Sequence, residues 1–490
     1  MALALFSNGD LKSQHSLGLL VGDYNTPYAY SLNPALTRGN LSNRAYINWW
    51  GASLSLDNNF MKYNAPFRLS KWVNNDFPAE NVNANGTLAF KQSWLPTDLT
   101  VKDWKLNYLN EVYGPSIFIP LDNIGGFGFG VRGISGFSVN GLSGDMGGIF
   151  RYGLGDSAVG GLRSLRGKNV NQGEFSINTE KYQEWFMSFA GYTQPDVVNS
   201  MRLGFTAKLL IGMGMAHLGS DNLSFSVKND QVVDIQQLNA RFFHTNDQSV
   251  ATAMSAPFGL KFDFMNGAGA GMDFGFMYEF RPNANRINNS ISFCDREKFE
   301  QYKWKFGASI TDLGFISYDG RGSEIISIAN TEYKVDPNIV NALQYNQGED
   351  RFDKVDDKFF NQLNANAVNS FVSYSPTALN VQFDNALTNH FHIGGYWTQS
   401  LKGKNTVGLR RSSYLSVVPR WQGETIEIGM PITASYDYNK MNLGLYGRFG
   451  PLIVGSDNLA GLGQFINNDY YSGASFYFGF RSKIGDCEVA

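Results

Sequence analysis

Residues 201–215, MRLGFTAKLLIGMGM, show a long and regular alternation of apolar and polar positions. Every odd position of this stretch is apolar, whereas the even positions are charged, hydroxylated or glycine, with Leu210 as the exception. Because successive side chains of a β-strand point to opposite faces, the pattern predicts a strand with one oily and one polar face. A membrane-crossing strand needs roughly 9–11 residues, whereas strands of globular proteins usually have about 5–6. The length of the stretch therefore favours a strand that crosses a membrane.

The two faces of this strand supply the first candidate residues. We expect four side chains of the apolar face to contact lipid: Phe205, Leu209, Ile211 and Met213. We expect three side chains of the polar face to line a lumen: Arg202, Thr206 and Lys208. His390 and His392 stand two positions apart in a later alternating segment, so we place both on the lumen face of that strand.

The same alternation recurs down the chain, with tight turns and long polar segments between the strands. It is clearest in residues 46–56, 127–139, 258–264, 272–280, 302–310, 391–397, 426–438 and 474–480. The pattern predicts an all-β fold, a transmembrane antiparallel β-barrel of about fourteen strands. Residues 57–110, 141–181 and 335–369 are predicted to be long polar loops on the external side of the barrel.

The N-terminal region lacks this alternation. Residues 1–6 look like the end of the apolar part of a signal peptide, so residues 1–40 are interpreted as a signal remnant followed by an irregular segment. Residues 16–40 are rich in Asn, Pro, Gly and Tyr, and we expect them to enter the lumen as a plug. Residues 41–490 are predicted to form a single outer-membrane barrel, because the composition does not shift along them.

A large soluble all-β protein, such as a propeller or a sandwich, is the structural alternative. Its strands would also alternate, but they would be shorter, and a propeller would repeat at about 40–50 residues. The sequence shows no repeat of that kind.

Composition agrees with the barrel. Charged residues make up 17% of the chain, whereas soluble proteins carry about 25%. The formal net charge of −3 argues against a nucleic-acid partner, which requires a basic face. The mean hydropathy of −0.25 is compatible with a membrane protein whose apolar positions alternate with polar ones. The spacing of Cys294 and Cys487 fits neither a metal site nor a redox motif, and it leaves open whether they pair.

The motifs of the chain do not indicate catalysis. Residues 128–133 fit GxGxxG, but they lie inside an alternating strand with no helix after it, so small lumen residues explain them better than a dinucleotide site. A metal site needs more ligands than His390 and His392, so we interpret them as polar wall residues. Arg410, Arg411 and Arg420 either line an anion path or are ordinary lumen and loop charges. We therefore expect no enzyme activity, no cofactor and no bound metal.

Three segments resemble known families of membrane barrels. Residues 31–36, SLNPAL, resemble the Asn-Pro-Ala signature of long-chain fatty-acid-transporter-like barrels. Residues 417–421, VVPRW, and 450–458, GPLIVGSDN, resemble a family of Bacteroidota outer-membrane barrels of unknown function, which is similar to secretion-associated barrels of that phylum. The resemblance covers most of the chain, implies location in the cell outer membrane, and includes no catalytic residue.

Two hypotheses of function remain at this point. In the first, the barrel is a structural or accessory subunit of an envelope machine for protein secretion or outer-membrane assembly, with outer-membrane lipid and other envelope proteins as partners. In the second, it is a fatty-acid-transporter-like channel for small apolar molecules. A channel of that kind needs an apolar pocket, whereas the predicted lumen faces are charged or bare and the three long polar segments offer surface to partners. The sequence therefore favours the accessory role.

Overall fold

A computed structural model of the chain describes most of its 490 residues. The described residues are 16–22, 26–37, 45–62, 64–67, 78–82, 91–121, 125–152, 162–195, 198–229, 232–245, 265–283, 302–335, 355, 359–423, 425–435, 440–461 and 473–484. Cys294, Cys487 and the strand predicted at residues 258–264 lie outside them.

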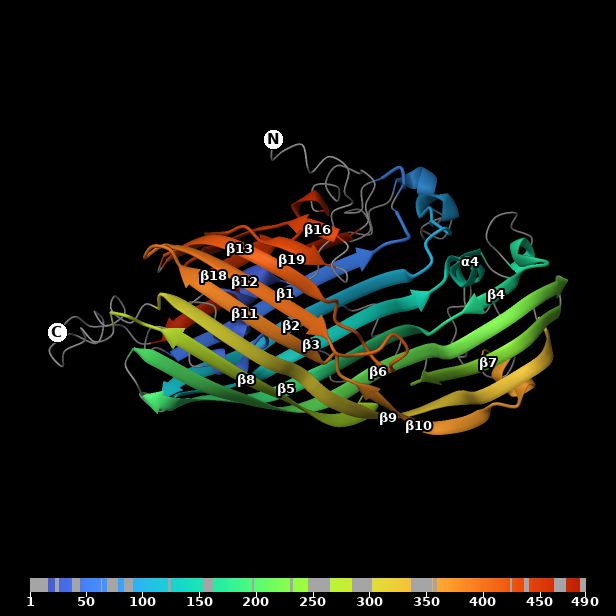
Figure 1. The fold of residues 1–490 in the computed structure, drawn as a ribbon, viewed down its shortest axis with the longest axis horizontal. Coiled ribbons are helices and arrows are strands. Elements are labelled where there is room, and N and C mark those ends of the chain that lie inside the picture. The colour runs from blue at the N-terminus through green and yellow to red at the C-terminus, as the bar shows by residue number, and fades with distance from the viewer. Residues whose placement is uncertain are drawn as a thin grey trace.

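One antiparallel sheet of nineteen strand segments closes on itself, because β1 pairs with both β2 and β19 (Figure 1). The first nine segments are β1 (Ala45–Asn58), β2 (Trp104–Leu121), β3 (Gly125–Leu142), β4 (Asn169–Gln172), β5 (Phe175–Pro195), β6 (Asn199–Asn229), β7 (Val232–His244), β8 (Gly267–Phe280) and β9 (Trp304–Lys334). The other ten are β10 (Asn366–Tyr374), β11 (Ala378–Ala386), β12 (Phe391–Ser400), β13 (Tyr414–Gln422), β14 (Ile426–Gly429), β15 (Ile432–Ser435), β16 (Lys440–Leu443), β17 (Leu445–Phe449), β18 (Leu452–Ser456) and β19 (Gly473–Ile484).

Five strands of the barrel each consist of two consecutive segments. β7 and β8 both pair with β6 and with β9, and they lie end to end along the same line of the sheet. The same relation joins β4 to β5, β10 to β11, β14 to β15 and β16 to β17. The wall is therefore a closed barrel of fourteen antiparallel strands, which confirms the fold predicted from the alternation.

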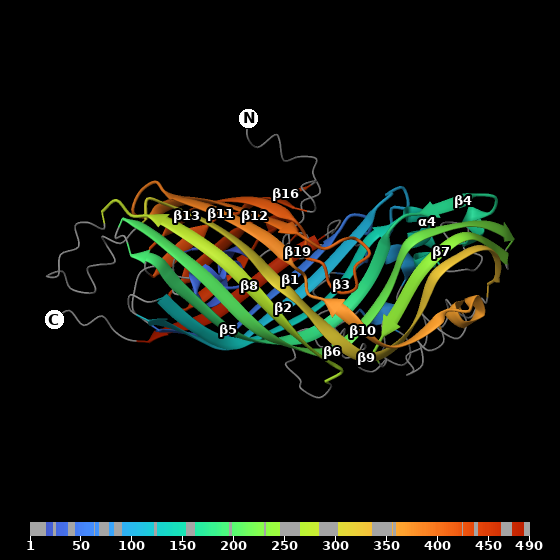
Figure 2. The same ribbon diagram turned by 60° about the horizontal axis from the view of Figure 1, so that its bottom comes forward.

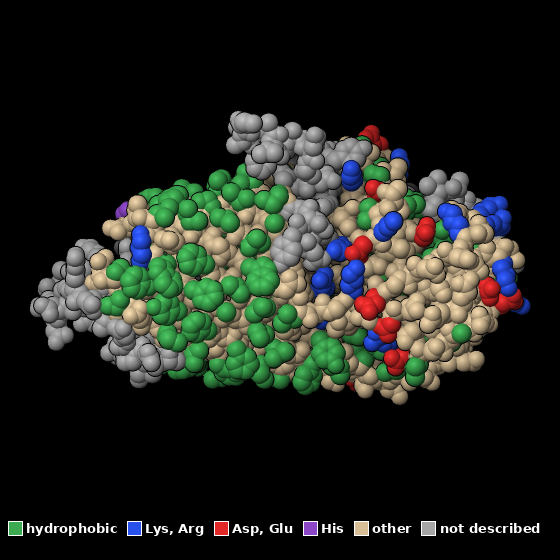
Figure 3. Space-filling model, viewed as in Figure 1, with side chains coloured by type: hydrophobic (Ala, Val, Ile, Leu, Met, Phe, Trp, Pro, Cys, Tyr) green, Lys and Arg blue, Asp and Glu red, His purple; other side chains and the backbone are tan. Residues whose placement is uncertain are grey.

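The outer surface divides into two zones. Large apolar side chains cover one half of the barrel, and charged side chains gather on the other half (Figure 3). The exposed apolar side chains, which we call the belt, include Leu203, Phe205, Leu209, Met272, Phe274, Phe306, Ile310, Leu313, Phe315, Val417, Phe476 and Phe480. A closed barrel with such a belt is an outer-membrane β-barrel.

The wall continues far beyond the belt at one end. β6 and β9 each have 31 residues, and at about 3.3 Å per residue such a strand is about 100 Å long. We call this end the outer extension: β4, β7, residues 212–229 of β6, residues 321–334 of β9, α4 (Gly144–Tyr152) and η5 (Leu162–Leu165). Figures 1 and 2 both show α4, β4 and β7 together at this end. Because long segments of outer-membrane barrels lie on the external side, we place the extension outside the cell.

The helical elements are short and few among the described residues. They are α1 (Leu17–Leu20), α2 (Thr26–Ala29), η2 (Pro34–Leu36), η3 (Ala79–Asn81), η4 (Gln92–Trp94), α4, η5 and η8 (Asn361–Leu363). Within the part of the chain that the structure describes, no helix is both long and apolar enough to cross a membrane.

Leu209→Arg tests the position of the belt. The Leu209 side chain is 55% exposed on β6, and a charge there would face lipid, so we expect the free energy of unfolding to fall by about 2–4 kcal/mol. Ile326→Arg is the matched control, because Ile326 is 65% exposed on the part of β9 that lies in the outer extension. Urea unfolding in phospholipid vesicles measures both variants, and equal losses would contradict this position of the belt.

Candidate functional site

The N-terminal segment, residues 16–37 as far as described, lies inside the barrel. The backbone N–H groups of Leu17 and Gly18 donate to the Asp457 carboxylate and the Tyr477 hydroxyl, each over 3.0 Å. The Tyr28 hydroxyl donates to Asn48 on β1 over 2.6 Å. The side chains of α1 are buried among tyrosines of the wall, and so is Tyr28. We call this segment the plug.

Two glycines of the wall permit the plug to approach closely. A Cβ atom on Gly204 of β6 would lie 2.1 Å from the backbone nitrogen of Ala35, and one on Gly275 of β8 would lie 2.1 Å from the Asn33 side-chain oxygen. Asn33 caps η2 by accepting the Ala35 N–H at 2.9 Å and donates its own N–H to the Phe276 carbonyl at 3.0 Å. The Asn-Pro-Ala segment thus packs against strands that have glycine at the facing lumen positions.

Seven charged side chains, all buried except the partly exposed Arg411, form one network across the lumen. Four are acidic and three are basic: Glu111, Glu184, Asp273, Asp312, Arg132, Lys208 and Arg411. Asp312 is at the centre, because its carboxylate accepts from Arg132 at 2.8 Å, from Lys208 at 2.7 Å and from Arg411 at 3.2 Å. The side chains of Asp312 and Lys208 are 3% and 2% exposed. At this depth each charge depends on its partners, because water does not solvate it.

A β-bulge turns Asp312 toward the lumen. Ile310 pairs with Phe274 and Leu313 with Met272, so two residues of β9 face Asp273 alone. Asp312 adopts the left-handed region with φ 56°, which Asp tolerates better than most residues. Its backbone N–H donates to the Asp273 carboxylate at 2.6 Å. The bulge therefore supplies the network with its central carboxylate.

Residues 401–413, which we call the strap, cross the lumen between β12 and β13. All of them are described, and none lies in a strand. The backbone N–H groups of Gly408 and Leu409 donate to Asn178 and Glu180 on β5, at 3.1 and 3.3 Å. Burial and the positive charges of Arg241 and Lys402 lower the pKa of His217 in the outer extension to about 3. The neutral ring of His217 bonds to the same Asn178 oxygen at 2.7 Å, which fixes the anchor of the strap.

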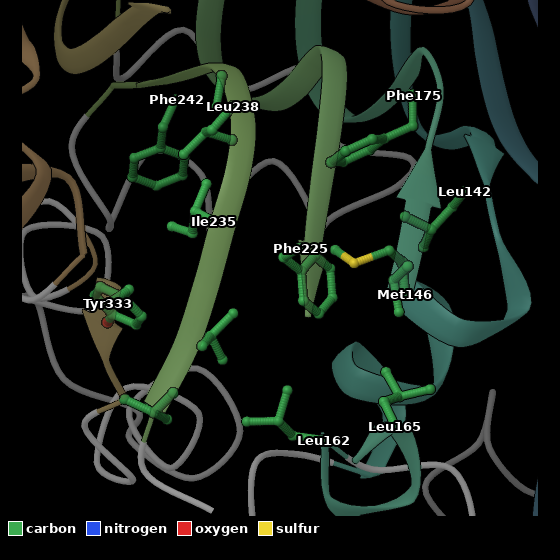
Figure 4. Packing of buried hydrophobic residues seen from close by; sticks show 14 of the residues in the cluster. Leu142, Met146, Leu162, Leu165, Phe175, Phe225, Ile235, Leu238, Phe242 and Tyr333 are labelled. Carbon is green, nitrogen blue, oxygen red and sulfur yellow. The ribbon is translucent and has the colours of Figure 1, made fainter. Parts of the chain in front are cut away.

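A large apolar cluster fills the interior of the outer extension. Figure 4 shows Phe225 of β6 next to Met146, and it shows Ile235 and Phe242 of β7 on the side of the cluster where Tyr333 lies. We call this set the outer cluster. It includes Phe60, Trp104, Leu106, Leu142, Met146, Leu162, Leu165, Val170, Phe175, Phe225, Val227, Ile235, Leu238, Phe242, Val335, Val355, Phe360 and Leu363.

The outer cluster draws side chains from all three segments that the sequence predicts as polar loops. Phe60 and Trp104 come from residues 57–110, and their rings stack at 4.0 Å. Met146 and Phe360 come from residues 141–181 and 335–369. These segments therefore differ from the prediction, because they turn apolar side chains inward and include strand and helix. Spacing indicated this only in residues 353–363, where Val355, Phe359, Phe360 and Leu363 predict a short amphipathic helix. The other apolar residues are scattered among polar ones.

The candidates in residues 201–215 occupy two environments. Arg202, Thr206 and Lys208 are buried on the inner side: Arg202 pairs with Glu279 and Thr206 bonds to Ser188 at 2.8 Å. Phe205 and Leu209 are exposed on the belt, and Ile211 is half-buried.

Met213 differs from its expected position on the lipid face, because it is only 6% exposed. Gly212 pairs with Tyr182 and Gly214 with Lys181, so Met213 stands at a register shift. A bulge reverses the alternation, and Met215 beyond it is fully buried.

The two histidines do not share a strand face. His392 is buried on β12, with its Nδ1 atom 3.3 Å from the Tyr302 hydroxyl. His390 lies in the turn before β12, is exposed, and packs its ring 5.8 Å from that of Trp421. The expected pair of lumen imidazoles is therefore not formed, because β12 begins at Phe391 and His390 precedes it. Among the described residues, no cluster of His, Cys, Asp and Glu has a geometry that would hold a metal ion.

The arginines highlighted by the sequence belong to separate groups. Arg411 joins the network around Asp312, whereas Arg420 on β13 pairs with Asp384 at 2.6 Å. Glu111, Glu184 and Asp312 were not predicted from the sequence as partners of these cations. Their only signal is a charged residue inside an alternating strand.

The chain matches one family and several solved barrels. Residues 34–457 match DUF5723, a family of unknown function, so the chain belongs to that family. A deltaS2S3 mutant of the TodX monoaromatic hydrocarbon channel is 9% identical, with a TM-score of 0.43 and coverage of 97% of this chain and 99% of that chain. The P. putida toluene transporter TodX is 8% identical, with a TM-score of 0.42 and coverage of 97% and 100%. A Pseudomonas aeruginosa FadL homologue is 9% identical, with a TM-score of 0.25 and coverage of 97% and 99%. A search of curated proteins gave no match.

Asp312→Asn tests the charge network. Asn tolerates the same left-handed backbone, so the variant removes the one carboxylate that contacts Arg132, Lys208 and Arg411 together. We expect the free energy of unfolding to fall by about 3–5 kcal/mol. Asp319→Asn, at an exposed position of the same strand, is the control and should have little effect. Urea unfolding gives the comparison, and an Asp312→Asn variant as stable as the wild type would show that the network is not coupled.

Gly204→Ala tests whether the plug packs closely against β6. The added methyl would overlap the backbone of Ala35, so we expect the plug to be displaced and chymotrypsin to cut faster after Tyr28 and Tyr30. Gly271→Ala on β8 is the control, because a Cβ there meets its nearest atoms at 3.5 Å, an ordinary contact. Limited proteolysis with mass spectrometry measures both rates. Identical rates in the two variants would rule out this close approach.

Proposed function

We propose that this member of the DUF5723 family is an outer-membrane channel for small apolar molecules. The observation that supports the proposal is the outer cluster, which gives the extension an apolar interior. Each methylene group that leaves water for such an interior gains about 0.8 kcal/mol, so hydrocarbons and fatty acyl chains are the ligands that it favours.

The arrangement of the two zones supports the same reading. The outer cluster lies beyond the belt, where a molecule from the external medium arrives first. Below it, the network around Asp312 provides charges that a porin would use for polar solutes, but these charges are mostly buried and are paired with one another. The polar lumen is thus occupied by its own side chains, and the apolar extension is the part whose chemistry suits a ligand.

The same observation weakens the hypothesis of an accessory subunit. That hypothesis depended on three long polar segments as surfaces for partners. Phe60, Met146 and Phe360, one from each segment, instead point into the outer cluster. The described parts of these segments build the wall and interior of the extension.

Photolabelling of outer membranes tests the proposal. The probe is dodecanoic acid that carries a diazirine, and mass spectrometry of the digested protein identifies the labelled residues. We expect label on inward-facing residues such as Phe225 and Phe242, and we expect unlabelled dodecanoate and toluene to compete with it. Label confined to outward residues of the belt, such as Phe205, would contradict the proposal.

Uptake by cells provides a second test. Phe225→Glu places a charge in the outer cluster, so we expect uptake of radiolabelled dodecanoate to fall toward that of cells without the protein. Asn222→Glu is the matched control, because Asn222 is exposed on the same part of β6. Equal uptake by both variants, at equal amounts of folded protein in the outer membrane, would argue against the outer cluster as the entry site.

A further inference from the structure

We infer that the strap is a gate, and that the recess beneath its tip is a second binding site for the same small apolar molecules. The inference rests on the proposed function. In the structure the tip of the strap occupies this recess, so a ligand would have to displace it. The structure therefore represents the closed state of the channel.

The strap reaches the far side of the barrel. It connects β12 to β13, the ninth and tenth of the fourteen strands when β1 is counted first. On the far side, Asn107 of β2 donates to the Arg410 carbonyl at 2.8 Å, and Ser176 of β5 donates to the Lys404 carbonyl at 2.6 Å. On the near side, the backbone N–H of Tyr374 on β10 donates to the Val407 carbonyl at 3.1 Å. β2 and β12 are seven strands apart in either direction around the barrel. A segment with these contacts separates the outer cluster from the charge network.

The tip of the strap is apolar, and so is the recess that holds it. Val407 and Leu409 are buried together with Ile134, Tyr182, Leu210, Phe243, Tyr318 and Phe371. The rings of Phe243 and Tyr318 lie 5.4 and 5.5 Å from that of Phe371 in stacked arrangements. A recess that accepts the methyl groups of Leu409 has the chemistry to accept a hydrocarbon of similar size.

The strap is built to move as a unit. The Lys402 ammonium donates to the carbonyls of Val407 and Leu409 at 3.2 and 3.0 Å, so the two ends of the tip are tied to each other. Gly408, with φ 105°, makes the sharp bend between the two apolar residues. At the rim, the strap is attached by Lys404 to Asp103 at 3.0 Å and by Asn405 to Asp221. Both rim contacts are partly exposed, and exposed ion pairs contribute only about 0–1 kcal/mol.

Exchange of the tip for a ligand breaks polar contacts and conserves apolar ones. Lifting the strap breaks the weak rim contacts and the buried hydrogen bonds to Asn178 and Glu180, and it removes Val407 and Leu409 from the recess. A ligand that enters the recess restores the lost apolar contact, so it compensates for the apolar part of the cost, whereas the polar contacts hold the strap closed when no ligand is bound. Arg411 belongs to the strap, so its ion pairs with Glu111 and Asp312 break when the strap moves.

Locking the strap tests the inference. Asp221→Cys and Asn405→Cys, in a chain whose native cysteines are serine, are joined by a short bifunctional methanethiosulfonate that a reductant removes. The probe is the diazirine-bearing dodecanoic acid used above. In the locked protein we expect label at Tyr318 and Phe371 to fall by about tenfold, because the competent state is no longer populated. We expect label at Phe225 to remain, and we expect the reductant to restore the label in the recess.

The outcomes separate the two proposals. Label at Tyr318 and Phe371 that is unchanged by the lock would overturn the gate. Label at Phe225 without label in the recess, even in the unlocked protein, would overturn the recess as a site and leave the proposed function standing. Absence of label at all inward residues would overturn the proposed function itself.

A second variant does not depend on a cross-link. Leu409→Ala shortens the tip while leaving the rim and the network unchanged, so we expect label in the recess to rise several-fold. Leu415→Ala is the control, because Leu415 is 48% exposed on the outer face of β13. Equal labelling of the recess in Leu409→Ala and Leu415→Ala would contradict the role of the tip.

Discussion

The interior of this barrel depends on the mutual compensation of buried charges. Asp312 contacts three cations, and all of these groups except the partly exposed Arg411 are buried. Burial of a single unpaired charge costs several kcal/mol, so each group requires the others in place. The partners come from β2, β3, β5, β6, β8, β9 and the strap. A network of this kind therefore holds together segments that are far apart in the sequence.

The plug and the strap close the lumen in different ways. The plug fits by shape, since Gly204 and Gly275 lack the Cβ atoms that would exclude Asn33 and Ala35. The strap fits by polar anchors around an apolar tip. Between them lies the charge network, which an apolar molecule cannot enter without leaving charges unsolvated. The side chains of the interior thus change at the level of the strap. They are apolar on the external side of the strap, and they are paired charges on its other side.

The local alternation of apolar and polar residues predicted the strands of the wall. The other features depend on contacts between residues that are far apart in the sequence. The alternation in residues 201–215 indicated a strand with two faces, and the structure contains it as the N-terminal half of β6. It failed at Met213, because a bulge shifts the register and periodicity assumes that none occurs. Asn33 and Pro34 indicated a turn, but their fit against Gly204 depends on strands that lie more than a hundred residues away. The outer cluster was hidden for the same reason, since its residues are scattered and meet only when the barrel closes.

Ion conductance across a planar lipid bilayer tests the central claim most directly. The plug, the charge network and the strap together close the lumen at the level of the membrane, while the interior of the extension is apolar. Wild-type protein reconstituted in molar potassium chloride should therefore show no steady ohmic pore. A stable, porin-like conductance in every inserted molecule would contradict the account, because it would require a continuous water-filled path through the described network.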